Sequence, residues 1–167
     1  MQLRKPKLED KMNLLNYVLE HYINGEMNIC AANEMPIIPY EEWIKKIKAD
    51  EKGKNKEWGI SEIYVLEDNN EILGMLNIRY TLSEEKAEKY GHIGYGVRPN
   101  ARKKGYATYM LKEALKKCKR RGMTEVIISC YEKNIASQKI ILNNNGEFYK
   151  KDKIKGKDSV FYKINLK

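Results

Sequence analysis

Apolar residues recur at steps of three and four along two N-terminal stretches of the chain, and this period predicts two amphipathic helices. The first helix is expected over residues 7–24 and the second over residues 37–50. Gly25 is placed to end the first helix, because glycine readily adopts the left-handed conformation that terminates helices. Glu41 and Glu42 suit the positive end of the second helix dipole.

Further along the chain, the apolar runs become shorter and are separated by turn residues, which is typical of β-strands. Residues 61–68 and 71–82 are predicted as two strands of a hairpin, since "DNN" between them is a turn signal. Residues 83–90 are polar and fit either a loop or a short helix. Residues 91–97 form a third apolar segment, which ends before Pro99 because proline cannot donate a hydrogen bond to a sheet.

The segment over residues 101–121 shows the clearest helical period of the chain. Its apolar stripe comprises Ala107, Met110, Leu111, Ala114, Leu115 and Cys118. Basic residues at its end and Gly122 after it suit a helix C-terminus. The remaining elements are a strand over 124–131, a helix over 135–143 and a hairpin over 147–166. This order predicts a mixed α/β or α+β sheet with helices packed on it, in a single domain over 1–167.

The composition suits one compact domain and adds few constraints. The 167 residues, 42% of them hydrophobic, suffice for one core, and no apolar run approaches the roughly 18 residues of a membrane span. The N-terminal stretch lacks the apolar region of a secretory signal. Three cysteines without a CxxC pair, and two histidines without a matching ligand spacing, predict reduced thiols, no metal site and a cytoplasmic location.

The net charge of +9 leaves two kinds of partner open, nucleic acid and an anionic small molecule. The lysines are spread along the whole chain, which favours a solvated basic surface with no special role. The sequence contains no zinc finger, recognition helix or RNP-like motif, so it gives no support to a nucleic-acid partner.

The junction "GHIGYGVRPNARKKGYA", residues 91–107, combines glycines, a proline and a basic cluster between a strand and the long helix. It is not a Rossmann fingerprint, because Pro99 occupies the third glycine position, and no stretch fits the P-loop pattern. A helix start nevertheless offers free N–H groups and positive potential, which together bind phosphates. Gly105 would let an anion approach the backbone, and Lys103 and Lys104 would attract it. The alternative is a solvated basic helix start without a ligand, although lysines there oppose the helix dipole.

Two motifs resemble the GNAT superfamily of N-acetyltransferases, in particular a subgroup of predicted bacterial acetyltransferases. Arg102, Gly105 and Ala107 form R-x-x-G-x-A, which is similar to the acyl-CoA-binding motif of that superfamily. Asn134, Ser137 and the later "GEF" resemble its second conserved segment. The resemblance extends to the element order over nearly the whole chain. It implies a central, mostly antiparallel sheet with a splayed parallel pair of strands, flanked by helices.

The resemblance implies that the anion is the pyrophosphate of coenzyme A and that acetyl-CoA is the co-substrate. The backbone N–H groups expected to cradle it belong to Arg102, Lys103, Lys104, Gly105, Tyr106, Ala107 and Thr108. The strand ending at Val97 would pair with the pantetheine arm, and Gly94 and Gly96 would let it approach closely. Asn134 and Ser137 would line the far side of the cofactor, although both equally fit the capping positions of an ordinary helix.

The chemistry implied by the resemblance is direct attack of a primary amine, from a small molecule or a protein, on the thioester of acetyl-CoA. The amine must lose a proton, and His92 is the predicted base, ahead of Tyr131 and Glu132. Tyr95 is predicted to lie in the core, because it shares a strand face with apolar neighbours. Many family members carry a tyrosine proton donor seven residues after the asparagine, but here Ile141 occupies that position. This departure leaves open a non-catalytic acyl-CoA sensor, and the resemblance leaves open a homodimer.

Overall fold

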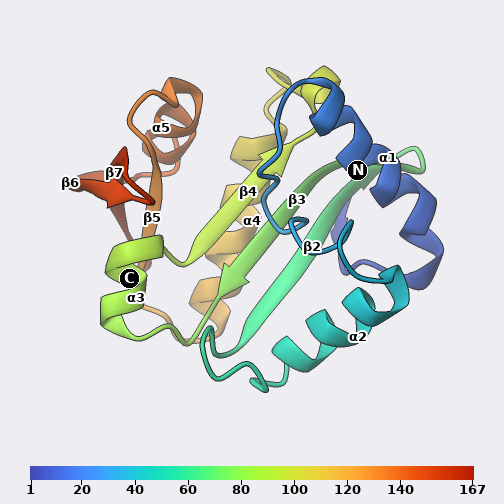
Figure 1. The fold of residues 1–167 in the computed structure, drawn as a ribbon. Helices are drawn as coiled ribbons and strands as arrows, with labels where there is room; N and C mark the ends of the chain where they lie inside the picture. Colours follow the sequence, from blue (N-terminus) through green and yellow to red (C-terminus); the bar gives the residue numbers. More distant parts are fainter.

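The computed structural model describes residues 1–167 and places seven strands in two antiparallel sheets, with five α-helices around them (Figure 1). The first sheet has the strand order β1-β2-β3-β4, formed by Gln2–Arg4, Ser61–Asp68, Glu71–Arg79 and Ile93–Val97. The second has the order β5-β7-β6, formed by Glu125–Tyr131, Lys157–Asn165 and Glu147–Ile154. The predicted mixed α/β class with mostly antiparallel strands is confirmed.

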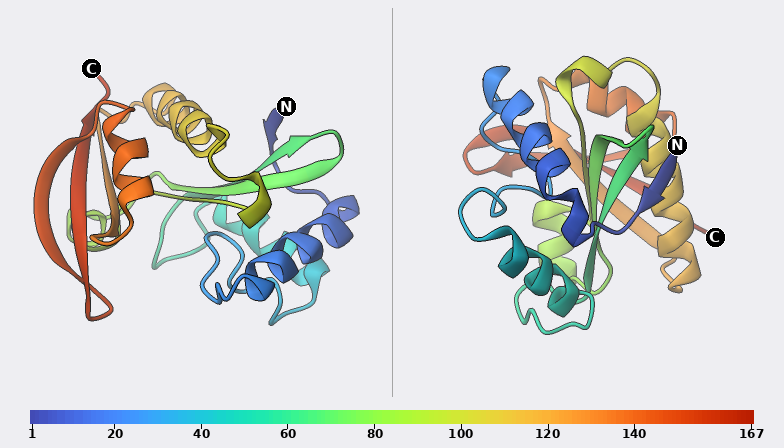
Figure 2. Two further views of the ribbon diagram at one scale, coloured as in Figure 1. Left: turned by 90° about the horizontal axis from the view of Figure 1, so that it is seen from above. Right: turned by 90° about the vertical axis from the view of Figure 1, so that its right-hand side faces the viewer.

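The five helices are α1 (Lys11–Ile23), α2 (Tyr40–Asp50), α3 (Glu84–Tyr90), α4 (Tyr106–Arg120) and α5 (Ile135–Leu142). α3 and α5 pack against β5, and the other three cover both faces of the first sheet. Figure 2 shows α1 and α2 on one face of this sheet and α4 on the other. One apolar cluster joins α1 and α2 to β2 and β3, and a larger cluster joins α4 to both sheets. None of the helices has the length and apolar character that a bilayer crossing requires.

Two predicted helix starts are wrong because proline and glycine delay them. α2 begins at Tyr40 rather than at residue 37, since Pro39 is extended and the residue before a proline avoids the helical conformation. α4 begins at Tyr106 rather than at residue 101, because residues 99–101 form a 3₁₀ turn and Gly105 is left-handed. The loop that carries the basic cluster is therefore longer than its sequence pattern indicates.

The sequence pattern does not define three short elements of the structure. β1 was not predicted, because three residues are too few to show a period, yet Leu3 pairs with Leu66 of β2. α1 is preceded by a 3₁₀ turn over Leu8–Asp10. The polar stretch before β4 is the helix α3, whose first turn is capped by the Ser83 hydroxyl accepting from the Lys86 N–H.

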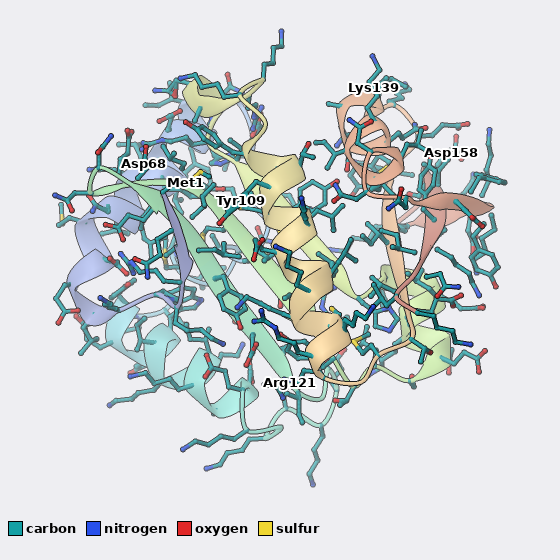
Figure 3. All side chains as sticks on the ribbon, turned by 180° about the vertical axis from the view of Figure 1, so that it is seen from behind. Met1, Asp68, Tyr109, Arg121, Lys139 and Asp158 are labelled. Atoms are coloured by element: carbon teal, nitrogen blue, oxygen red, sulfur yellow. The ribbon has the colours of Figure 1, made fainter.

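The predicted apolar stripe of α4 lies at the centre of the larger core. Its fully buried members are Met110, Leu111, Ala114 and Cys118. Ala107 and Leu115, at the margins of the stripe, are half-buried. Figure 3 shows α4 lying across the sheet, with Tyr109 near one end and Arg121 at the other. This packing fixes the rotation of α4 and therefore the direction in which its N-terminus points.

β4 and β5 meet at one end and then diverge, which divides the molecule into its two sheets. The N–H of His92 donates to the carbonyl of Ile127 at 2.7 Å. Beyond this point β4 pairs with β3 and β5 pairs with β7, and no ladder joins β4 to β5. The predicted splayed pair is therefore formed by β4 and β5. The single central sheet that was expected is interrupted between these two strands. The divergence leaves one edge of β4 uncovered.

Candidate functional site

A cleft of about 660 Å³ lies along the uncovered edge of β4, between the starts of α4 and α5. Part of the segment between α1 and α2 closes its remaining side. Nine of the ten predicted cofactor-binding residues line it: Val97, Arg102, Lys103, Gly105, Tyr106, Ala107, Thr108, Asn134 and Ser137. Lys104 instead lines a neighbouring cavity of about 220 Å³. The fold thus brings two motifs that are far apart in the sequence to one cleft.

The edge of β4 in the cleft carries backbone groups that pair with no other strand. Arg98 donates from its N–H to the Leu73 carbonyl, so the even-numbered residues of β4 face β3. In an antiparallel ladder, the alternate residues direct their N–H and C=O groups to the opposite edge. Tyr95 and Val97 therefore direct theirs into the cleft, where β5 has moved away. An extended chain that contains amide groups could complete this ladder.

The loop between β4 and α4 presents a continuous series of free N–H groups. From Lys103 to Thr108, no backbone N–H donates to another group of the protein. Lys103 and Gly105 have positive φ angles of 62° and 82°, which turn neighbouring N–H groups into one concave surface. A Cβ on Gly105 would meet nothing within 4 Å, so the space beside it is open to a ligand. We call residues 103–108 the cradle, since its geometry suits a phosphate at the positive end of the α4 dipole.

Arg102 holds the cradle in place. Its Nε donates to the Val97 carbonyl at 3.0 Å, and its two terminal nitrogens donate to both carboxylate oxygens of Glu26 at 2.6 Å. The Arg102 guanidinium, more than any other group, lowers the pKa of Glu26 to about 2. The side chain of Arg102 therefore brings no free charge to the cleft, because Glu26 already compensates it.

His21 is a cleft residue to which the sequence interpretation gave no role. Its ring is almost fully buried, and its Nδ1 lies 2.7 Å from Oε2 of Glu26. Burial lowers the pKa of His21 and outweighs the opposite effect of the Glu26 carboxylate. The other ring nitrogen, Nε2, is buried without a hydrogen-bond partner. No local signal marks this residue, because only the fold brings Glu26 and Arg102 together next to it.

Asn134 and Ser137 face β4 from the start of α5. The Asn134 Oδ1 accepts from the Ser137 N–H at 3.1 Å, which confirms the capping role that the sequence left open. The Ser137 hydroxyl lies 2.8 Å from the hydroxyl of Tyr95, which reaches over from β4. Tyr95 packs against the larger core, as predicted, and it also lines the cleft. Burial raises the pKa of Tyr95, so its hydroxyl keeps its proton at neutral pH.

His92 lies at the opposite end of β4 from the cradle and does not line the cleft. Its Nδ1 accepts a hydrogen bond from the Ile127 N–H at 3.0 Å, which leaves the proton of the neutral ring on Nε2. Burial lowers the pKa of His92, which favours that neutral ring. The lone pair that a base would use is therefore occupied. The role of His92 as base stays a prediction, and this hydrogen bond argues against it.

The other predicted proton-transfer groups also lie outside the cleft lining. Ile141 is fully buried in the larger core, in keeping with its apolar side chain. Glu132 forms an ion pair with Lys151, and the Tyr131 ring lies 5.2 Å from the Nζ of Lys157. Among the tyrosines, Tyr95 is the one that lines the cleft at the edge of β4.

Gly94 and Gly96 serve different purposes in the structure. A Cβ on Gly94 would lie 2.9 Å from the Sγ of Cys30, so a larger residue at position 94 would require the Cys30 side chain to move. The expectation that Gly94 makes room for the cofactor therefore needs correction, since Cys30 takes that space. Gly96 lines the cleft, and a Cβ there would make only ordinary contacts. Burial raises the pKa of the Cys30 thiol to about 11.

All three cysteines are free in the structure. Cys118 is buried in the larger core, whereas Cys30 and Cys130 are half-buried. The side chains of His, Cys, Asp and Glu form no group of three or more with a metal-binding arrangement.

The sequence matches a known protein family. The family model described as the acetyltransferase (GNAT) family matches residues 32–142, which include the cradle and the start of α5. No curated protein matches the sequence.

Solved structures share the fold at low sequence identity. RimL, a ribosomal L7/L12 alpha-N-protein acetyltransferase in complex with coenzyme A, is 18% identical with a TM-score of 0.71, over 98% of this chain and 92% of that one. An N-acetyltransferase from Staphylococcus aureus Mu50 is 20% identical with a TM-score of 0.70, over 99% and 98%. The putative acetyltransferase yncA from Salmonella typhimurium, with its cofactor acetyl-CoA, is 13% identical with a TM-score of 0.69, over 99% and 94%.

Proposed function

Because the chain belongs to the acetyltransferase (GNAT) family, we propose that it is an acetyl-CoA-dependent N-acetyltransferase. In the proposed reaction, acetyl-CoA supplies an acetyl group activated as a thioester. A primary amine of a small molecule or a protein attacks this group directly. We further propose that residues 1–167 act as one domain in the cytoplasm, where the free cysteines would stay reduced.

The observation that carries the proposal is the presence of two kinds of unpartnered backbone in one cleft. The free N–H groups from Lys103 to Thr108 suit the pyrophosphate of coenzyme A. The open edge offers the backbone groups of Tyr95 and the N–H of Val97 to the pantetheine arm, whose amides could pair with β4 as a further strand would. The Val97 carbonyl already accepts from the Nε of Arg102. A free phosphate would need only the first feature, whereas a diphosphate joined to an amide-containing arm needs both.

The proposed proton donor is Tyr95. It lines the cleft on the far side of Val97 from the cradle. Its hydroxyl is positioned by the Ser137 hydroxyl at 2.8 Å, and its raised pKa means that it carries a proton to donate. We propose that Tyr95 donates this proton to the departing thiolate of coenzyme A, because the side chain of Ile141 has no proton to donate. His92 could take the amine proton only after its bond from Ile127 breaks, so its role as base requires a direct test.

The second candidate function is an acyl-CoA sensor without turnover. The observation that favours it is that the base predicted from sequence is not available, since His92 does not line the cleft and its Nδ1 is occupied. Such a protein would bind acetyl-CoA through the same cradle and edge.

The experiment that separates these functions has two parts. The binding of acetyl-CoA is measured by calorimetry, and the release of coenzyme A is measured across a panel of amino acids, polyamines, aminoglycosides and peptides. The proposal expects binding together with coenzyme A release that depends on at least one amine. Tight binding without release on any amine would support the sensor, and the absence of binding would contradict both functions.

A further inference from the structure

Arg79, at the end of β3, is a half-buried arginine without an acidic partner. Arg4 and Arg98, which the fold also withdraws from solvent, each form ion pairs with two carboxylates. Arg79 makes one hydrogen bond, from Nη1 to the Gly91 carbonyl at 3.2 Å, and its Cζ lies 5.1 Å from the centre of the Trp58 ring. Its Nε and Nη2 have no acceptor in the protein. These two nitrogens are not among the buried unpaired atoms, so they remain free to bind an anion from outside the chain.

Arg79 does not line the cleft itself but lies beside the start of β4, at the end far from the cradle. Its N–H donates to the His92 carbonyl at 2.8 Å, which places it opposite the start of β4. Cys30, which lines the cleft, is close enough to Arg79 that the guanidinium charge opposes the effect of burial on the thiol pKa. A molecule held by Arg79 would therefore enter from the side opposite to the cradle, where an acceptor must meet the acetyl group.

Two more polar atoms on this face of the sheet have no hydrogen-bond partner. The Tyr17 side chain is fully buried, and its hydroxyl would lie 3.4 Å from a Cβ on Gly96, which lines the cleft. The Oδ1 of Asn77 is also buried and unpaired, and Asn77 is opposite Gly94 in the ladder. Buried polar atoms are seldom left unpaired in folded proteins, so the acceptor Oδ1 of Asn77, two residues before Arg79, suits a hydrogen-bond donor such as an amine at this end of the cleft. The Tyr17 hydroxyl lies beside Gly96, nearer the cradle.

We propose that Arg79 binds an oxyanion, either a carboxylate or a phosphate group, that the amine acceptor carries. The acceptor is then an anionic amine rather than a polyamine or an aminoglycoside. This inference rests on the proposed function and names its substrate class. Arginine suits the task because its planar guanidinium donates two parallel hydrogen bonds to such groups.

The charge around Arg79 agrees with this assignment. The Nζ of Lys86 lies 5.4 Å from the same Trp58 ring and donates to the backbone carbonyl of Glu57, so it forms no ion pair. Burial lowers the pKa of Arg79, and Cys30, the one titratable group whose charge affects it, acts in the opposite direction. A cationic acceptor would be repelled by Arg79 and Lys86, whereas an anionic one would be attracted.

The test compares acceptors of matched length that differ in the group opposite the amine. The value of kcat/KM is measured for 4-aminobutyrate, 4-aminobutanamide and 1,4-diaminobutane, which carry a carboxylate, an amide and a second amine. The same measurement on O-phosphoethanolamine and ethanolamine shows whether a phosphate is preferred as a carboxylate is. The wild type is expected to prefer the oxyanion members. Arg79→Gln should lower kcat/KM for them by about 10- to 100-fold, the size of a charged hydrogen bond, and should leave the amide unchanged. Arg79→Lys keeps the charge but lacks the planar guanidinium. Its kcat/KM for the oxyanion acceptors should lie between those of the wild type and Arg79→Gln.

A binding measurement without acetyl-CoA tests the inference independently of turnover. The preferred oxyanion amine should raise the melting temperature of the wild type and should not raise that of Arg79→Gln. Arg121→Gln is the matched control, because Arg121, like Arg79, lies over an aromatic ring, that of Tyr80, but already pairs with Glu62. Equal kcat/KM on the amide and the oxyanion members, or an equal loss on both in Arg79→Gln, would overturn the inference. A lack of turnover on every amine, with the anion-induced shift still present, would count against the proposed function and not against the anion site.

Discussion

The two ends of the cleft are built in different ways. The cradle end consists of backbone N–H groups from consecutive residues, and its geometry is set by the left-handed Gly105 and the start of α4. The opposite end consists of side chains from segments far apart in the sequence, among them Cys30 and Tyr95, and Arg79 lies beyond the cleft lining on that side. One end therefore has the form of a local motif, and the other exists only after the chain has folded.

This difference corresponds to a difference in what each end would recognise. A backbone cradle can bind the same diphosphate in many proteins, because it depends little on side-chain identity. The side-chain end can change its preferred acceptor by single substitutions, because hydrogen bonds and charges there belong to individual residues. Substitutions at the two ends should accordingly separate cofactor binding from turnover and from acceptor choice.

The largest expected effect belongs to Gly105→Glu at the cradle. The new carboxylate would occupy the open space beside residue 105 and repel a pyrophosphate, so affinity for coenzyme A should fall by roughly 100-fold or more. Calorimetric titration measures this loss. Gly122→Glu is the matched control, because Gly122 has nearly the same φ, 81° against 82°, and the same open space at the other end of α4. If both variants bind coenzyme A equally, the cradle is not the binding site.

The next effect is on turnover, in Tyr95→Phe. Removal of the hydroxyl deletes the proposed proton donor and should lower kcat by about 100-fold, the usual size of a single acid contribution. The KM for acetyl-CoA should hardly change, since Phe keeps the packing of the ring. Steady-state kinetics with the best amine of the panel measure both quantities. An unchanged kcat would remove Tyr95 from the mechanism and leave the cradle unaffected.

A smaller effect concerns stability, in Glu26→Gln. The pKa of Glu26 is lowered from 4.5 to about 2 by Arg102, so its ionised form adds stability above pH 4.5 that is lost as the pH falls toward 2. The melting temperature of Glu26→Gln should thus lie below that of the wild type at pH 7, and the gap should close near pH 2. Glu34→Gln, which breaks the exposed pair with Lys46, is the control and should show little difference. A gap that is constant with pH would mean that the ion pair of Glu26 does not stabilise the loop.

The smallest effect is expected for His92→Asn. Because Nδ1 accepts from the Ile127 N–H, the loss of the ring should lower kcat only a few-fold, much less than a lost base would. The pH dependence of kcat provides the check. A fall of about 100-fold together with the loss of the acid limb of the profile would restore His92 as the base predicted from sequence.

The parts of this molecule that the sequence predicted are those with a local signal. The period of the α4 stripe agrees with its packing. The cradle could be located because Arg102, Gly105 and Ala107 lie within six consecutive residues. Asn134 and Ser137 lie one helical turn apart, so their capping bond was also foreseeable.

The parts that escaped prediction depend on contacts between distant residues. The bond of Tyr95 to Ser137 joins residues 42 positions apart, and that of Arg102 to Glu26 joins residues 76 apart. The fit of Cys30 against Gly94 likewise has no sequence signature, since a strand glycine can accommodate either a ligand or a neighbouring side chain. His92 was favoured because of its intrinsic pKa, whereas its hydrogen bond from β5 is visible only in the fold.

The central claim is that unpaired backbone groups in one cleft bind acetyl-CoA. Nitrogen-15 NMR of amide hydrogen exchange, with and without coenzyme A, tests it at single residues. The cofactor is expected to slow exchange at the amides from Lys103 to Thr108 and at Tyr95 and Val97, and to leave the start of α2 unchanged. Unchanged exchange at these amides in the presence of saturating coenzyme A would contradict the account.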